Sequence, residues 1–115
     1  MSNILIAEDE SRIASFIEKG LRKNGFNTAV ATNGEEALSM IQNNNFDLLL
    51  LDLGLPVKDG WTVLNELRNQ GNQIPIIVVS AYNNVKKDNG MTHYVAKPFR
   101  FKELLKIVQF HLQED

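Results

Sequence analysis

The sequence predicts an α/β fold, in which an open, doubly wound parallel β-sheet carries helices on both faces. Strand-sized apolar runs alternate with helical patterns along the whole chain. The run that ends at Asp52 is apolar on both alternating faces, as expected for a central strand covered on both sides. With 115 residues, 43% of them hydrophobic, the chain has the size and composition of a single domain, 1–115.

The first half of the chain contains two strand–helix units. A strand over Asn3–Ala7 stops at a run of acidic residues. A helix follows, and we expect Ser11 to be its N-cap. Its inward face consists of apolar residues at helical spacing, namely Ile13, Phe16, Ile17 and Leu21. The second unit is a strand over residues 27–31 and a helix that follows Asn33-Gly34.

The second half adds three strands. The central strand ends at Asp52 and leads through a turn into a third helix. The strand over residues 74–79 ends at Ser80, and the strand over residues 92–96 ends at Lys97. The last helix has an apolar stripe formed by Phe101, Leu104, Leu105, Val108 and Leu112. Phe110 falls outside this stripe, so we expect its side chain to be exposed.

The interval between the fourth and fifth strands is short for a full crossover helix. Residues 83–90 contain one apolar residue and mostly poor helix formers. We therefore expect the fourth of five helices to have one or two turns, or to be missing.

Strands joined by right-handed helical crossovers pair in parallel. For five strands, the flavodoxin-like order 2-1-3-4-5 is the leading choice, and ligands then bind beyond the carboxyl ends of the strands. The residues that end the strands here are polar or charged: Glu8, Asp9, Asp52, Ser80 and Lys97. We expect them to meet at one edge of the sheet.

The three acids at this edge predict a Mg²⁺ site. Carboxylates gathered at close range repel one another unless a cation compensates them. Mg²⁺ prefers one or two carboxylates together with carbonyl and water oxygens. We expect Asp9 and Asp52 to bind the ion directly, Glu8 to bind it through water, and the carbonyl of Gly54 to be a further ligand.

The same edge has the groups that phosphoryl transfer needs, since that reaction depends mainly on positioning and charge compensation. A carboxylate can act as a nucleophile and form an acyl phosphate. Asp52 is best placed for this role because it ends the central strand. Ser80 is expected to donate to one phosphoryl oxygen, and Lys97 to pair with another.

Several short segments occur in a specific order: Ile4–Glu10, Asn33–Leu38, Asp47–Leu53, Leu55-Pro56 with Asp59-Gly60, Ser80-Ala81 and Lys97-Pro98-Phe99. Together they resemble the receiver domain of two-component response regulators, over essentially the whole chain. The resemblance implies that Asp52 accepts a phosphoryl group from a sensor histidine kinase or a phosphotransfer protein, with Mg²⁺ required. It implies a signalling switch that catalyses only its own phosphorylation and dephosphorylation.

The resemblance also implies how such a switch is read. On phosphorylation, Ser80 and Tyr94 would move together and remodel the face formed by the fourth helix, the fifth strand and the fifth helix. This face is a candidate for a homodimer contact. The resemblance leaves open whether transcription is regulated through an effector domain or through a partner protein. In this family the Lys97-Pro98 bond is usually cis.

Composition and charge argue against several other functions. The chain has no cysteine, which excludes thiolate catalysis and Cys-ligated zinc. A net charge of −2 gives no overall attraction for nucleic acid, and no apolar run approaches the roughly 20 residues that span a membrane. We expect a cytoplasmic protein that makes no direct contact with DNA or a membrane. His93 and His111 are expected to be plain surface residues.

Three other functional classes are disfavoured. A pseudo-receiver that acts only as a scaffold would not need the complete set of acids, hydroxyl and lysine that this chain has. An aspartate-nucleophile small-molecule phosphatase would also use Asp52 and Mg²⁺, but enzymes of that type have a second aspartate two positions later, where this chain has Gly54. A nucleotide or flavin binder is disfavoured because no glycine-rich phosphate loop follows the first strand.

Overall fold

The computed structural model describes residues 2–82 and 90–112. Its five strands form one parallel sheet in the order β2-β1-β3-β4-β5. The strands are β1 (Asn3–Ala7), β2 (Asn27–Ala31), β3 (Leu48–Leu51), β4 (Ile76–Ser80) and β5 (His93–Ala96). The helices are α1 (Ser11–Lys23), α2 (Gly34–Asn43), α3 (Gly60–Asn69) and α4 (Phe101–Leu112). The predicted fold class and strand order are confirmed.

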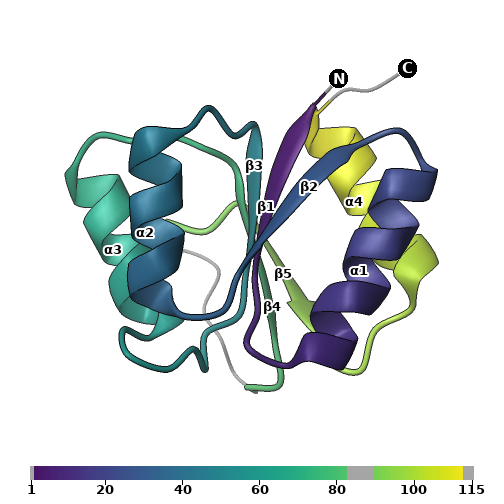
Figure 1. Ribbon diagram of the computed structural model, residues 1–115, viewed down its shortest axis with the longest axis horizontal. Coiled ribbons are helices and arrows are strands. Elements are labelled where there is room, and N and C mark those ends of the chain that lie inside the picture. Colours follow the sequence, from purple (N-terminus) through teal and green to yellow (C-terminus); the bar gives the residue numbers. More distant parts are fainter. Residues whose placement is uncertain (1, 83–89, 113–115) are drawn as a thin grey trace.

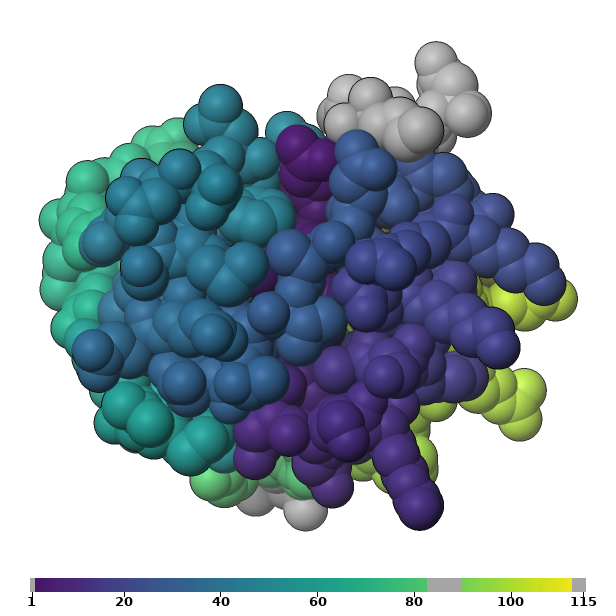
Figure 2. Space-filling view, in the orientation of Figure 1, coloured from purple at the N-terminus to yellow at the C-terminus, as the bar shows by residue number. Residues whose placement is uncertain are grey.

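Helices cover the sheet on both sides. Figure 1 shows α2 and α3 on one face of the sheet and α1 and α4 on the other. In the space-filling view, the purple and blue side chains of α1 and the blue and teal ones of α2 lie on either side of the edge formed by β2 (Figure 2). The fifth helix of the sequence analysis is therefore α4 here. The short or missing helix expected before it concerns residues 83–89, which lie outside the described residues.

The central strands divide the core into two halves. Leu49 and Leu51 of β3 pack into the half beneath α2 and α3, whereas Leu48 and Leu50 pack into the half beneath α1 and α4. All four leucines are at most 2% exposed. Burying one such side chain stabilises the fold by about 1.5–3 kcal/mol. The residue that follows β3 is therefore held by a rigid, fully covered strand.

Side-chain caps start two of the helices. Asn33 Oδ1 accepts a hydrogen bond from the backbone N–H of Glu36 at 2.8 Å, and Asp59 Oδ1 accepts one from the N–H of Thr62 at 2.8 Å. These bonds satisfy backbone donors that a helix start leaves without partners. The caps fix where α2 and α3 begin, beside the loop that follows β3.

The expected N-cap of α1 is wrong. Ser11 is the first residue of the helix, and the N-cap is Glu10, whose side chain makes no capping bond. The carbonyl of Glu10 accepts the first bond of the helix from Ala14, at 3.0 Å. The N–H of Glu10 donates to Glu8 Oε2 at 3.1 Å, and this contact holds Glu10 extended just before the helix.

Two further expectations are corrected. Phe16 does not face the core, since it is 55% exposed, and Ala14, Ile17 and Leu21 occupy the buried face of α1. The fourth strand begins at Ile76 and not at residue 74, because the carbonyl of Ile74 accepts a hydrogen bond from Arg68. Phe110 is 74% exposed, as predicted. Across the described residues, no helix is both long and apolar enough to cross a membrane.

Candidate functional site

The carboxyl ends of the strands meet at the lower edge of Figure 1. Ala7 of β1 lies opposite Leu51 of β3, so the residues that follow these strands are neighbours. The N–H of Asp52 donates to the carbonyl of Ala7 at 3.0 Å and fixes this register at the end of the strands. The parallel register therefore brings Glu8 close to Asp52.

The three predicted metal ligands with carboxylate side chains lie together. One carboxylate oxygen each from Glu8, Asp9 and Asp52 can be chosen so that all lie within 4.8 Å of one another. Glu8 is 3% exposed and Asp52 is 9% exposed, whereas Asp9 is exposed at the rim. Such a set of hard oxygen ligands suits Mg²⁺. Gly54 also lies at this edge, and its N–H donates to Asp52 Oδ1 at 3.2 Å.

Lys97 directly follows β5, and its side chain reaches into the acidic group. Its Nζ atom lies 2.7 Å from Glu8 Oε1 and 3.4 Å from Asp52 Oδ2. The Lys97-Pro98 peptide bond is cis, as expected. One ammonium group cannot balance three ionised carboxylates, so the site keeps an excess of negative charge. That excess favours a bound divalent cation.

Burial and charge shift two pKa values at this site. Burial raises the pKa of Glu8, and the nearby charge of Asp52 adds to this, although hydrogen bonds from Lys97 and Glu10 act in the opposite direction. Burial alone would lower the pKa of Lys97, but its hydrogen bond to Glu8 and the charges of Asp52 and Glu8 outweigh this and raise it. Lys97 is therefore firmly cationic at neutral pH.

Ser80 and Lys97 line the same cavity as Asp52. This cavity of about 420 Å³ is bounded by Glu10, Asp52, Gly54, Ser80, Ala81, Tyr82 and Lys97. Ser80 is 1% exposed, and its Oγ atom accepts a hydrogen bond from the N–H of Tyr82 at 3.3 Å. The predicted nucleophile, hydroxyl and lysine are thus gathered around one space. Glu10 and Tyr82 also line this cavity and were not predicted, although each lies within two residues of a predicted site residue.

Tyr94 is connected to Ser80 through the chain that follows β4. The hydroxyl of Tyr94 donates to the carbonyl of Tyr82, and the carbonyl of Ser80 lies 3.3 Å from the same hydroxyl. A displacement of residues 80–82 would therefore act directly on the Tyr94 side chain. Ser80 and Tyr94, which were predicted to form a switch, therefore contact each other through the Ser80 carbonyl.

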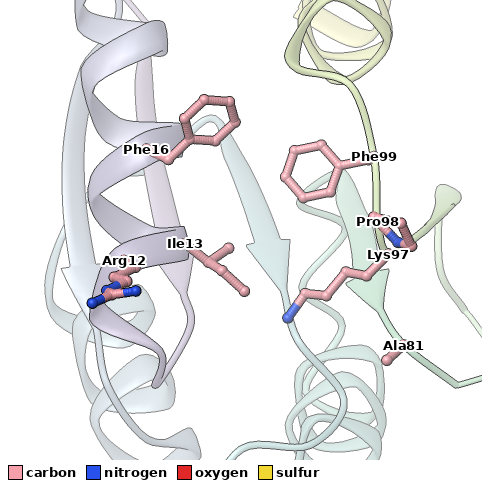
Figure 3. A pocket seen from close by; sticks show the side chains of 7 residues that line it. All are labelled: Arg12, Ile13, Phe16, Ala81, Lys97, Pro98 and Phe99. Carbon is pink, nitrogen blue, oxygen red and sulfur yellow. The ribbon is translucent and has the colours of Figure 1, made fainter.

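A second, more apolar groove of about 520 Å³ opens beside Lys97. In Figure 3, Arg12, Ile13 and Phe16 of α1 form one wall, and Lys97, Pro98 and Phe99 form the other. The Phe16 and Phe99 rings lie 6.4 Å apart across it. This groove was not predicted, because the helical spacing of Phe16 suggested that its side chain lies in the core.

A family model for the response regulator receiver domain matches residues 4–109. The chain belongs to this family. It is 34% identical over 110 residues to the transcriptional regulatory protein PcoR of Escherichia coli, a match that covers 91% of this chain and 49% of PcoR. The receiver domain described here thus spans about half the length of the curated relatives it matches. These matches identify it as a two-component signalling domain with transcriptional regulators among its relatives.

Solved receiver domains have the same fold. The receiver domain of the Francisella response regulator 1452 superimposes with a TM-score of 0.94 at 34% identity, and the match covers 98% of each chain. The response regulator TrrA of Thermotoga maritima, solved in complex with Mg²⁺ and BeF, gives a TM-score of 0.89 at 33% identity. That match covers 96% of this chain and 99% of TrrA.

Proposed function

We propose that this receiver domain accepts a phosphoryl group on Asp52 and changes its binding to a partner protein as a result. The observation that carries the proposal is the position of Asp52. Its carboxylate lies 3.4 Å from Lys97 Nζ and lines one cavity together with Ser80. At 9% exposed it is held firmly and can still be reached from that cavity.

The proposed donor is a phosphohistidine of a sensor histidine kinase or a phosphotransfer protein. A carboxylate oxygen of Asp52 attacks the phosphorus atom, and the bond between phosphorus and the imidazole nitrogen breaks. The imidazole leaves with the bonding electron pair and takes up a proton, while Asp52 becomes an acyl phosphate. Lys97 pairs with one phosphoryl oxygen and the Ser80 hydroxyl donates to another.

Mg²⁺ is the proposed cofactor. The donor set fits it, because Glu8, Asp9 and Asp52 offer carboxylate oxygens close together and Gly54 adds a carbonyl at the same edge. The bound ion would compensate the charge of the incoming phosphoryl group. The solved complex of TrrA with Mg²⁺ and BeF supports the same chemistry in this family.

The proposed output is a rearrangement that begins at Ser80. When its hydroxyl turns to a phosphoryl oxygen, the hydrogen bond from the Tyr82 N–H is lost, and the carbonyl that holds the Tyr94 hydroxyl shifts with it. The surface that changes includes β5 and α4. A homodimer or an effector would read this surface, in a cytoplasmic protein whose receiver domain makes no direct contact with DNA.

Binding of fluoroberyllate, a mimic of the phosphoryl group, tests the proposal without a kinase. We expect the wild-type protein to bind it only when Mg²⁺ is present, as measured by titration calorimetry, and we expect Asp52→Asn to bind none. Asp47→Asn is the matched control, because Asp47 precedes the same strand and contacts Asn3, far from the cavity. Binding by Asp52→Asn, or repeated hydrolysis of simple phosphomonoesters, would refute the proposal and favour a phosphatase.

A further inference from the structure

We propose that His93 and His111 together bind one divalent transition-metal ion of the Zn²⁺ class. These are the only two histidines of the chain. His93 begins β5 and His111 lies in the last turn of α4. The fold brings their rings to a centroid separation of 5.8 Å, with 61° between the ring planes.

This separation is close to what a shared ion needs. Zn²⁺ binds imidazole nitrogen at about 2.0–2.1 Å with tetrahedral geometry, which places the centroids of two ligand rings about 5 Å apart. The observed separation of 5.8 Å is close to this value. Both rings are partly exposed and border a cavity of about 490 Å³, so an ion can reach them from solvent.

The ligand type selects the ion. Neutral imidazole nitrogen suits Zn²⁺, Cu²⁺ and Ni²⁺, whereas Mg²⁺ prefers oxygen. The histidine pair is also separate from the acidic site, because His93 begins β5 while Lys97 follows the end of that strand. The two sites would therefore bind different ions at opposite ends of the strands.

The pair supplies two protein ligands. Among the described residues, the only set of three or more potential metal-binding side chains is Glu8, Asp9 and Asp52. Water or a group from another molecule would complete the coordination. Lys106 lines the same cavity and opposes a bound cation, but its side chain is exposed and can turn its ammonium group to solvent.

The experiment observes the two imidazoles directly. Protein labelled with ¹⁵N in histidine gives ring-nitrogen signals from two residues only, so metal binding elsewhere does not obscure them. Zn²⁺ and, separately, Mg²⁺ are added about one pH unit above the ordinary imidazole pKa of about 6.5. We expect Zn²⁺ to shift both imidazoles along a single binding curve and Mg²⁺ at the same concentration to shift neither.

Two single variants test whether the ligands act together. Removing one imidazole in His93→Asn or His111→Asn should weaken Zn²⁺ binding at the remaining ring by about a hundredfold, because the second contact is no longer intramolecular. Phe16→Ala, which removes an exposed phenylalanine ring on another helix and takes away no ligand, is the control and should keep the wild-type affinity. Separate binding curves for the two rings, or unchanged affinity in both asparagine variants, would overturn the proposal.

Discussion

Lys97 holds together two carboxylates that would otherwise repel each other. Its ammonium group contacts both Glu8 and Asp52, and its side chain is only 14% exposed. Removing one partner of a buried ion pair leaves an uncompensated charge, which typically costs 3–5 kcal/mol. This residue therefore matters for stability as well as for the proposed chemistry.

We expect Lys97→Gln to lower the free energy of unfolding by about 3 kcal/mol without Mg²⁺, and we expect added Mg²⁺ to recover part of this loss because it replaces the missing positive charge. Urea denaturation with and without Mg²⁺ measures both effects. Lys58→Gln is the control, since the Lys58–Glu66 pair is considerably more exposed and should contribute about 1 kcal/mol or less. Equal losses in the two variants, with no effect of Mg²⁺ on either, would contradict this view of Lys97.

Phe16 and Phe99 line an apolar groove that shares Ala81 and Lys97 with the cavity at the proposed phosphoryl site (Figure 3). A protein donor that brings its phosphohistidine to Asp52 must cover the surface around the cavity. An exposed apolar groove beside a reactive centre is a suitable contact for such a donor. If the proposed function holds, a protein donor at Asp52 would cover this groove, and Phe16 would contribute to its binding.

We expect Phe16→Ala to slow phosphorylation by a cognate kinase about tenfold and to leave phosphorylation by acetyl phosphate unchanged. Phe110→Ala is the matched control, because Phe110 is also an exposed phenylalanine on a helix but lines a different cavity. Rates with both donors are followed by phosphoprotein electrophoresis. If Phe16→Ala slowed both donors equally, the side chain would act on the site and not on docking.

The first residue of α2 packs closely against the loop that follows Asp52. A methyl group added at Gly34 would lie 1.8 Å from the carbonyl oxygen of Lys58. The N–H of Gly34 also lies 3.3 Å from the carbonyl of Pro56. The start of α2 thus limits how far the loop between β3 and α3 can move.

We expect Gly34→Ala to lower the free energy of unfolding by at least about 2 kcal/mol, because the backbone of α2 or of the loop must shift. Gly54→Ala is the control for stability, since the nearest atom to its added methyl group is 3.9 Å away. The denaturant midpoints of the two variants, each compared with the wild type, measure the loss of stability. A Gly34→Ala protein as stable as the wild type would show that the loop moves freely against α2.

The elements themselves were predictable, whereas contacts between distant residues were harder to foresee. Apolar periodicity located every described helix and strand to within two residues at the ends that it specified, and the rule for parallel sheets predicted where the strand ends meet. Phe16 was misplaced because helical spacing does not show how wide the buried face of a helix is. The contact between His93 and His111 was missed because no local pattern indicates that the start of β5 meets the end of α4.

In the whole molecule, the sheet separates the acidic site from the histidine pair. The acidic group and Lys97 lie at the carboxyl ends of the strands, and the histidine pair lies toward the opposite edge. Residues 80–82 and Tyr94 connect the acidic edge to β5 and so to the surface that a partner would read. In the proposed function, the change at this surface starts from a phosphoryl group on Asp52.

The most direct test locates the phosphoryl group. After phosphorylation in the presence of Mg²⁺, borohydride reduction converts an acyl phosphate of aspartate into homoserine, and peptide mass spectrometry then identifies the modified position. We expect homoserine at position 52 and at no other aspartate. Homoserine at position 9 or 59, or a phosphoryl group on a histidine with position 52 unmodified, would contradict the account.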